Sequence, residues 1–367
     1  MFSCRPILCL TSFAVAAATG LTSSRSAAEP VLPGIGPALQ AMVDQHEIAG
    51  AVTVVVSKDR ILHLENTGLA DVASKKPMTP ETLFWIASMT KPITGTAVLM
   101  LQDEGKLNVA DPVAKYLPEF AGLKTPSGKP ANLTITQILT HTSGLGEAGG
   151  PAAKEAKTLA DLVPLWLAAP MQYEPGARWA YTQSGINAAA RIVEVVSGLT
   201  FDAFLQQRLF DPLGMKSTTF YPTDAQRARL VTAYAKNKDT GLLEAVPPRE
   251  GYGARSRPPQ GNGGLFSTPS DYARFCQMLL GGGAPAAATE SAGEEAGAHG
   301  EPKAEEGHGE AKAEDHGGGE AAAAGEHGAE GGAATGEPGD VGHALECSGD
   351  DPCYYAMPKL IVNLARS

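Results

Sequence analysis

The alternation of apolar and polar positions begins with two short runs that are typical of paired strands. Residues 51–57 and 61–68 are rich in β-branched and apolar side chains, and the polar segment Lys58-Asp59-Arg60 separates them. Two runs of this length around a short polar turn indicate a β-hairpin. The sequence therefore predicts a hairpin over residues 51–68, preceded by a short helix over residues 37–46.

A long and mainly helical region follows the hairpin. The run over residues 92–104 is apolar around most of its circumference and ends at Gly105, which predicts a helix inside a domain. Prolines within residues 108–120 indicate an irregular segment there. Further helices are predicted over residues 136–140, 159–168, 185–197, 201–209 and 270–280, each followed within a few residues by glycine or proline.

The composition changes after Gly283. Residues 284–340 consist largely of Gly, Ala, Glu and His. With twelve Glu, two Asp and two Lys they carry a net charge of −12, whereas the whole chain carries −11. Such a tract cannot bury enough apolar surface to offset the entropy of ordering it. We expect a folded domain over residues 29–283, a disordered tract over 284–340 and a short segment over 341–367, whose apolar end docks as a strand or a helix.

The first 28 residues have the features of a secretory signal peptide. Arg5 gives a positive start, residues 7–18 are apolar, and Ser26-Ala27-Ala28 resembles a cleavage site. The apolar run is too short to span a bilayer, although an uncleaved anchor is the alternative. We expect a secreted or periplasmic protein with no membrane span after cleavage. The rest of the chain carries about +1, which predicts no nucleic-acid surface. The oligomeric state stays open.

The first candidate for chemistry is Ser88-Met89-Thr90-Lys91, just before the apolar helix. Residues three apart share a face of a helix, so the Ser88 hydroxyl and the Lys91 amine are expected side by side. An amine that burial keeps partly neutral can take the proton of a serine and make it a nucleophile. The alternative interpretation is an ordinary helix start with an exposed lysine.

A serine–lysine pair needs a further acid or base, and Tyr181 is the best candidate. It lies in a turn-rich loop directly before the helix predicted at residues 185–197. A tyrosine beside a lysine ammonium can relay a proton, whereas the plain alternative is a half-buried aromatic side chain. The histidines of the tract have no close, fixed spacing, so no metal site and no cofactor are expected.

Several segments together resemble the serine β-lactamase-like superfamily, which includes class C β-lactamases, D-Ala-D-Ala carboxypeptidases and β-lactamase-like esterases. Besides the serine–lysine tetrad, the similar segments are residues 137–145 (QILTHTSGL), Glu174-Pro175-Gly176 before Tyr181, residues 210–218 (FDPLGMKST) and residues 263–271 (GGLFSTPSD). The resemblance implies an α/β fold in which helices flank an antiparallel sheet, with an additional all-α domain. It also implies that Ser88 is the acyl nucleophile, that Lys91 and Tyr181 are its acid/base partners, and that His141 is structural.

Two departures from the family pattern bear on function. The second motif is commonly Tyr-x-Asn, and the third position here is Gln183, which we assign to substrate binding. The third motif, Lys-Thr-Gly or His-x-Gly on a C-terminal strand, has no match in a strand-like setting, so a truncated sheet is expected. His316-Gly317-Gly318 fits the pattern, but its low-complexity setting indicates coincidence.

The sequence therefore predicts an exported serine hydrolase that acts on a small ester, amide or β-lactam through an acyl-enzyme at Ser88. An ester is favoured because the side-chain amide of Gln183 lies one methylene further out than that of the family's asparagine, which contacts the amide of the substrate. Two alternatives stay open: a degenerate, non-catalytic relative that binds peptidoglycan-like or small acyl ligands, and a truncated or frame-disrupted gene product.

Overall fold

The computed structural model describes residues 32–248 and 251–283 and the backbone of residues 360–364. These segments belong to one compact unit. The predicted signal peptide and the predicted disordered tract lie outside the described residues. Within the described part of the chain, no helix combines the length and apolarity needed to cross a membrane.

The main sheet contains the predicted hairpin and has the strand order β3-β2-β1-β8. Strand β1 (Gly50–Val56) pairs antiparallel with β2 (Ile61–Asp71), which confirms the hairpin. The two-residue β3 (Lys76–Pro77) continues the sheet beyond β2. On the other side, β8 (Leu360–Leu364) pairs parallel with β1. The C-terminal apolar segment is therefore a strand, one of the two forms that its composition allowed.

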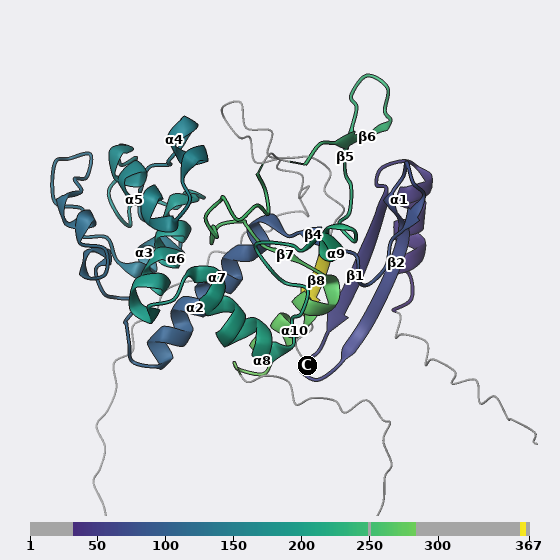
Figure 1. Ribbon diagram of the computed structural model, residues 1–367, viewed down its shortest axis with the longest axis horizontal. Helices are drawn as coiled ribbons and strands as arrows, with labels where there is room; N and C mark the ends of the chain where they lie inside the picture. The colour runs from purple at the N-terminus through teal and green to yellow at the C-terminus, as the bar shows by residue number, and fades with distance from the viewer. Residues whose placement is uncertain (1–31, 249–250, 284–359, 365–367) are drawn as a thin grey trace, which may run out of the picture. The chain divides into compact units, whose positions relative to one another are not determined.

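Both faces of strand β1 are covered, and every residue of it is buried. Successive side chains of a strand point to opposite faces. Val52, Val54 and Val56 accordingly join the main core, while Ala51 joins a smaller cluster with Leu39 of helix α1 (Ile35–Asp44). Helix α10 (Pro269–Leu280) packs against β1 and β8, as Figure 1 shows. Strand β1 is thus fully buried, whereas β2 stays partly exposed.

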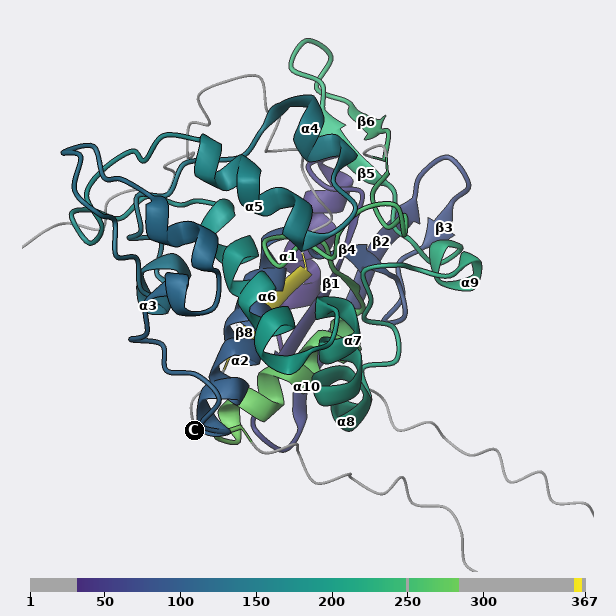
Figure 2. The same ribbon diagram turned by 60° about the vertical axis from the view of Figure 1, so that its left-hand side comes forward.

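The remaining helices include a group packed around α6, and two of them, over Gly150–Glu155 and Asp224–Arg227, were not predicted. They are α2 (Thr90–Asp103), α3 (Ile135–Leu139), α4 (Gly150–Glu155), α5 (Leu159–Ala168), α6 (Ser184–Ser197), α7 (Phe201–Leu205), α8 (Asp211–Leu213) and α9 (Asp224–Arg227). Helix α6 contacts α2, α3, α5 and α7, which Figure 2 shows from the side. The predicted irregular segment holds two short 3-10 turns, Val113–Lys115 and Pro118–Gly122.

Two helical predictions need correction. Helix α2 is not surrounded by protein, because the Leu99 side chain is 47% exposed while Ile93, Ala97 and Val98 are buried. The helix predicted over residues 201–209 continues instead as a π-helical turn over Gln206–Phe210 and then as α8. Single π turns widen a helix locally, and an apolar period alone does not distinguish them from α-helix.

Two small strand pairs complete the fold and were not predicted. Strand β4 (Phe84–Trp85) pairs with β7 (Phe266–Ser267), and β5 (Ala233–Lys236) pairs with β6 (Leu243–Val246). Strands of two residues are too short to show any alternation of polarity. The β4–β7 pair matters for the site, because it joins the residues before Ser88 to the segment around Gly263.

Candidate active site

The candidate nucleophile Ser88 lies in a tight turn between strand β4 and helix α2. A 3-10 turn covers Ala87–Met89, and Ala87 has a left-handed φ of 45°. Such a conformation is uncommon for a residue with a Cβ and costs energy. The buried Thr90 holds the turn: its hydroxyl donates to the Ala87 carbonyl at 2.7 Å and accepts the Leu265 N–H at 3.2 Å. Ser88 is thereby presented to solvent at the start of α2.

Lys91 lies on the same face of the helix start as Ser88, as the spacing predicted. Its Nζ is 3.1 Å from Ser88 Oγ, 2.9 Å from Gln183 Oε1 and 2.7 Å from the Asn262 carbonyl oxygen. Gln183 Oε1 and a carbonyl oxygen can only accept hydrogen bonds. These two acceptors therefore fix two of the Lys91 N–H bonds, and the third position at the nitrogen faces the serine hydroxyl.

Burial lowers the pKa of Lys91 to about 8, and the nearby carboxylate of Glu147 opposes part of this shift. An ordinary lysine with a pKa of 10.5 is almost entirely protonated at neutral pH. With a pKa of about 8, about a tenth of the molecules carry a neutral amine at pH 7. The direction of this shift is the one that a general base at neutral pH requires.

Tyr181 and Gln183 approach Lys91 from the loop before helix α6. The Lys91 Nζ lies 4.6 Å from the centroid of the Tyr181 ring, a cation–π contact, and Tyr181 is 43% exposed. The Glu147 carboxylate accepts the N–H groups of Gln183 and Ser184 and so caps the positive end of α6. The structure thus brings Ser88, Lys91, Tyr181 and Gln183 together around one amine.

His141 braces this loop, in agreement with the structural role that the resemblance implied. Its Nδ1 accepts the N–H of Thr182 at 3.2 Å, and its carbonyl oxygen accepts the N–H of Ala180 at 3.0 Å. Burial, and secondarily the charge of Lys91, lowers the pKa of His141. Because the backbone occupies Nδ1, that nitrogen is not available as a base.

Segment Gly261–Leu265 forms the third side of the site, and its part was not foreseen. The Gly261 carbonyl accepts the Thr94 hydroxyl at 2.7 Å, and a Cβ on Gly261 would lie 2.8 Å from Ala190 Cβ. Only glycine allows this close approach to α2 and α6. Asn262 follows and contacts both Lys91 and Gln183. Its position directly before the Gly263-Gly264-Leu265 motif was the available sequence signal.

A model of the family described as Beta-lactamase matches residues 37–336. A protein of Mycobacterium tuberculosis named Rv1367c is 35% identical over 277 residues, covering 69% of this chain and 67% of its own length. The chain belongs to the beta-lactamase family.

Other relatives in the beta-lactamase family are named after different activities. Esterase EstB of Burkholderia gladioli is 29% identical, covering 66% of this chain and 69% of its own length. The solved structure of EstCE1, a hydrolase with promiscuous acyltransferase activity, aligns with a TM-score of 0.57 and 25% identity, covering 66% of this chain and 69% of that one. The names of other relatives include penicillin-binding proteins and a β-lactamase. The fold is the serine β-lactamase fold predicted from the motifs.

Strand β8, with the sequence LIVNL, lies beside β1 and does not carry the Lys-Thr-Gly or His-x-Gly pattern of the family's third motif. Among the described residues, no group of three or more His, Cys, Asp or Glu is arranged to hold a metal ion.

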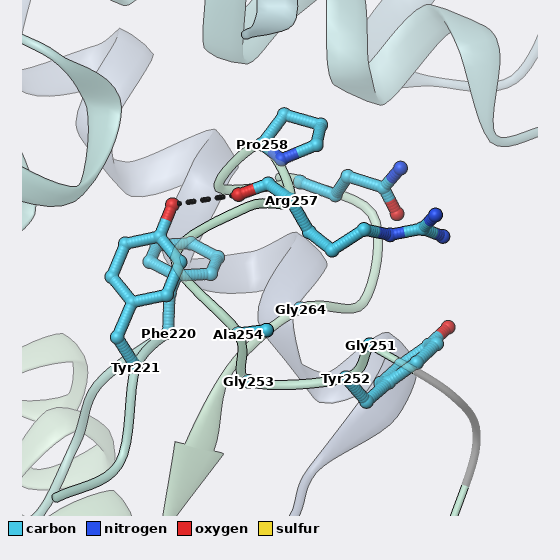
Figure 3. A pocket seen from close by; sticks show the side chains of 10 residues that line it. Phe220, Tyr221, Gly251, Tyr252, Gly253, Ala254, Arg257, Pro258 and Gly264 are labelled. Carbon is cyan, nitrogen blue, oxygen red and sulfur yellow. Dashed lines mark hydrogen bonds between the residues drawn. The ribbon is translucent and has the colours of Figure 1, made fainter. Parts of the chain in front are cut away.

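An open pocket lies next to segment 260–264 (Figure 3). Its walls include the aromatic side chains of Phe220, Tyr221 and Tyr252, and the Tyr221 hydroxyl donates to the Arg257 carbonyl at 3.0 Å. The Trp85 ring lies 4.5 Å from that of Tyr252. Gln260 and Gly264 line the pocket, so one short segment separates it from the contacts of Lys91.

Proposed function

We propose that this protein is a serine hydrolase in which Ser88 forms an acyl-enzyme with a small carboxylic ester. The observation that carries the proposal is the 3.1 Å contact between Ser88 Oγ and Lys91 Nζ. The other two atoms in contact with Nζ, Gln183 Oε1 and the Asn262 carbonyl oxygen, can only accept hydrogen bonds. A neutral amine has two N–H bonds and one lone pair. With both N–H bonds donated to Gln183 and Asn262, the lone pair is directed at the serine hydroxyl, as a general base requires.

The reaction then follows in two balanced steps. Ser88 Oγ attacks the ester carbonyl while its proton passes to Lys91, and the alcohol leaves after gaining a proton. Tyr181, whose ring lies against the Lys91 amine, is the group proposed to relay that proton. Water then attacks the acyl-serine, one of its protons returns through Lys91 to Ser88 Oγ as the acyl–oxygen bond breaks, and the acid is released. Helix α2 begins two residues after Ser88, and its positive end supports the negative charge that develops on the carbonyl oxygen.

An ester, rather than an amide or a β-lactam, is the favoured substrate. Gln183 stands where the family commonly has asparagine, and its Oε1 is already bound to Lys91 and Asn262. A site that holds this amide so firmly has less freedom to pair with the amide of a β-lactam. The names of EstB and EstCE1 support this choice. The three aromatic side chains in the pocket beside segment 260–264 offer an apolar surface for the acyl or alcohol part.

We also infer that the protein is exported and that residues 284–340 form a disordered insertion after Gly283, beyond which strand β8 completes the sheet of the hydrolase domain. The support is the signal-like pattern of residues 2–28 and the low-complexity composition of residues 284–340. N-terminal sequencing of the exported protein should begin at Glu29. Limited proteolysis should cut first within residues 284–340, and cleavage that starts inside residues 32–248 would contradict the boundary.

The acylation site can be tested directly with a fluorophosphonate probe and peptide mapping. The adduct is expected on Ser88, and Ser88→Ala should lose both labelling and hydrolysis of p-nitrophenyl acetate. Ser57→Ala is the matched control, because Ser57 lies at the exposed hairpin turn. Labelling of another serine with Ser88 unmodified would refute the assignment. Binding of the probe without any covalent adduct would favour the non-catalytic alternative.

A further inference from the structure

Asn262 makes an unusual set of contacts around the candidate base. Its carbonyl oxygen accepts from Lys91 Nζ at 2.7 Å, its side-chain Nδ2 donates to Gln183 Oε1 at 3.1 Å, and its own N–H donates to Asn187 Oδ1 at 3.1 Å. Its remaining atom, Oδ1, is buried without a hydrogen-bond partner among the described residues. Three of its four polar groups are therefore committed to the walls of the site.

The donor and acceptor roles in this network follow from Lys91. The ammonium form of Lys91 can only donate, and in the neutral form the lone pair is directed at Ser88 Oγ, so in both forms Gln183 turns Oε1 toward a Lys91 N–H. An atom that faces Oε1 from the other side must also be a donor, and this fixes Nδ2 of Asn262 in that position. The orphaned Oδ1 is the consequence of this orientation.

An unpaired buried oxygen is unfavourable for folding, because the oxygen loses its hydrogen bonds to water without replacement. A residue selected only for stability at this position would be apolar, or would satisfy both ends of its amide. The arrangement is explained if the orientation of Gln183 is what Asn262 provides.

We propose that Asn262 is a positioning residue, which holds Gln183 with its oxygen on Lys91 and its Nε2 turned toward an oxygen acceptor of the substrate. This inference rests on the proposed function and deepens it. With Asn262 in place, Gln183 can rotate its amide only by setting donors against donors at both Lys91 and Asn262. The substrate class that fits is a carboxylic ester, in which both the carbonyl oxygen and the alkoxy oxygen beside the scissile bond can accept from Nε2.

The charge state of Lys91 depends on every titratable group around it. Glu147 lies near enough to raise its pKa, while the charge of Lys91 itself lowers the pKa of His141. The Tyr181 ring faces the amine directly. Asn262 adds no charge to this set. A carboxylate at position 262 would add a negative charge near Lys91, so a substitution to aspartate is expected to raise the pKa of Lys91.

The experiment compares Asn262→Ala and Asn262→Asp with Asn66→Ala and Asn66→Asp. Asn66 is a matched control, since its Nδ2 donates to the Met78 carbonyl at 2.9 Å on strand β2. We expect Asn262→Ala to keep its melting temperature and to lose about 3- to 10-fold in kcat/KM, the effect of one neutral hydrogen bond. The double variant with Gln183→Ala should lose little more than Gln183→Ala alone.

Asn262→Asp should move the acid limb of the pH–rate profile to higher pH, because a carboxylate two hydrogen bonds from Lys91 favours the ammonium form. Neither Asn66 variant should move it. A profile unchanged in Asn262→Asp, or additive losses in the double variant, would overturn the proposal.

A second readout separates this inference from the proposed function. In a Ser88→Ala background, peptide-resolved acetylation of Lys91 across pH 6–11 reports its pKa without any turnover. The expected result is a pKa raised by about 1 in Asn262→Asp. If Lys91 shifts as expected but Ser88 is never acylated, the network stands and the hydrolase proposal fails. If Ser88 is acylated and Lys91 does not shift, the positioning role fails alone.

Discussion

The Trp85 indole N–H donates to the Gly263 carbonyl at 2.6 Å and so ties the strand before Ser88 to the segment that contacts Lys91. The tie is reinforced by the β4–β7 pair and by the hydrogen bond from Ile86 N–H to the Leu265 carbonyl at 3.0 Å. Ser88 and Asn262 are 174 positions apart in sequence, yet they flank the same amine. The geometry of the site therefore depends on how rigidly these two segments are joined.

The pH dependence of activity should report the Lys91 amine. Its pKa is lowered to about 8, so the neutral form is scarce below that pH and dominant above it. We expect kcat/KM for p-nitrophenyl acetate to rise with pH to a plateau above 8 and to be about 100-fold below the plateau at pH 6. Lys91→Ala should lose about 100- to 10,000-fold. A flat profile between pH 6 and 9 would show that another group is the base.

Removing the Glu147 charge should shift that profile in a defined direction. The carboxylate raises the pKa of Lys91, so Glu147→Gln should lower the pKa and move the acid limb to lower pH. The cap of α6 weakens at the same time, which we expect to cost about 1 kcal/mol of stability. Glu174→Gln is the control, because Glu174 also accepts a backbone N–H, from Ser127, at an exposed position. An acid limb that moves to higher pH in Glu147→Gln would contradict this account.

Thr90 should matter far more than Thr96, although both are threonines of helix α2. Thr90→Val leaves the buried Leu265 N–H without its acceptor, which we expect to cost about 1–3 kcal/mol and to slow labelling of Ser88. Thr96 donates only to the Pro92 carbonyl of its own helix, so Thr96→Val should cost less than about 0.5 kcal/mol. Urea unfolding of both variants gives the comparison. Equal losses would mean that the turn does not depend on Thr90.

Ester turnover should exceed β-lactam turnover, and Gln183 should set the ratio. We expect a larger kcat/KM for p-nitrophenyl acetate than for nitrocefin, and Gln183→Asn should shift the ratio toward nitrocefin by restoring the shorter amide. The same two assays on Gln172→Asn control for loss of a glutamine elsewhere, since the Gln172 side chain donates to the Pro170 carbonyl at an exposed position. A preference for nitrocefin in the unaltered protein would reverse the proposed substrate class.

The sequence predicted the elements that a local pattern can encode. The β-hairpin over residues 50–71 and helix α5 at Leu159–Ala168 follow directly from apolar runs bounded by turn residues. The tetrad spacing placed Ser88 beside Lys91 because a helix start fixes that geometry. Burial of the amine then followed from the apolar residues behind it.

What the sequence did not reveal depends on contacts between distant segments. Asn262 has no periodicity or motif of its own, and its importance comes from Lys91 and Gln183, which lie 171 and 79 positions away. Glu147 likewise acts through the start of α6. Strands β4 and β7 are two residues each, so only their mutual pairing defines them.

The pairing of β1 with β8 has a consequence for biosynthesis. Val54 pairs with Val362, a separation of 308 residues, so β1 leaves the ribosome long before its partner is made. At 5–20 residues per second the wait is about 15–60 s. During that time one edge of β1 exposes unpaired backbone groups and invites pairing with other chains. Until the last strand is made, this edge of β1 is therefore a site where the nascent chain is open to mispairing.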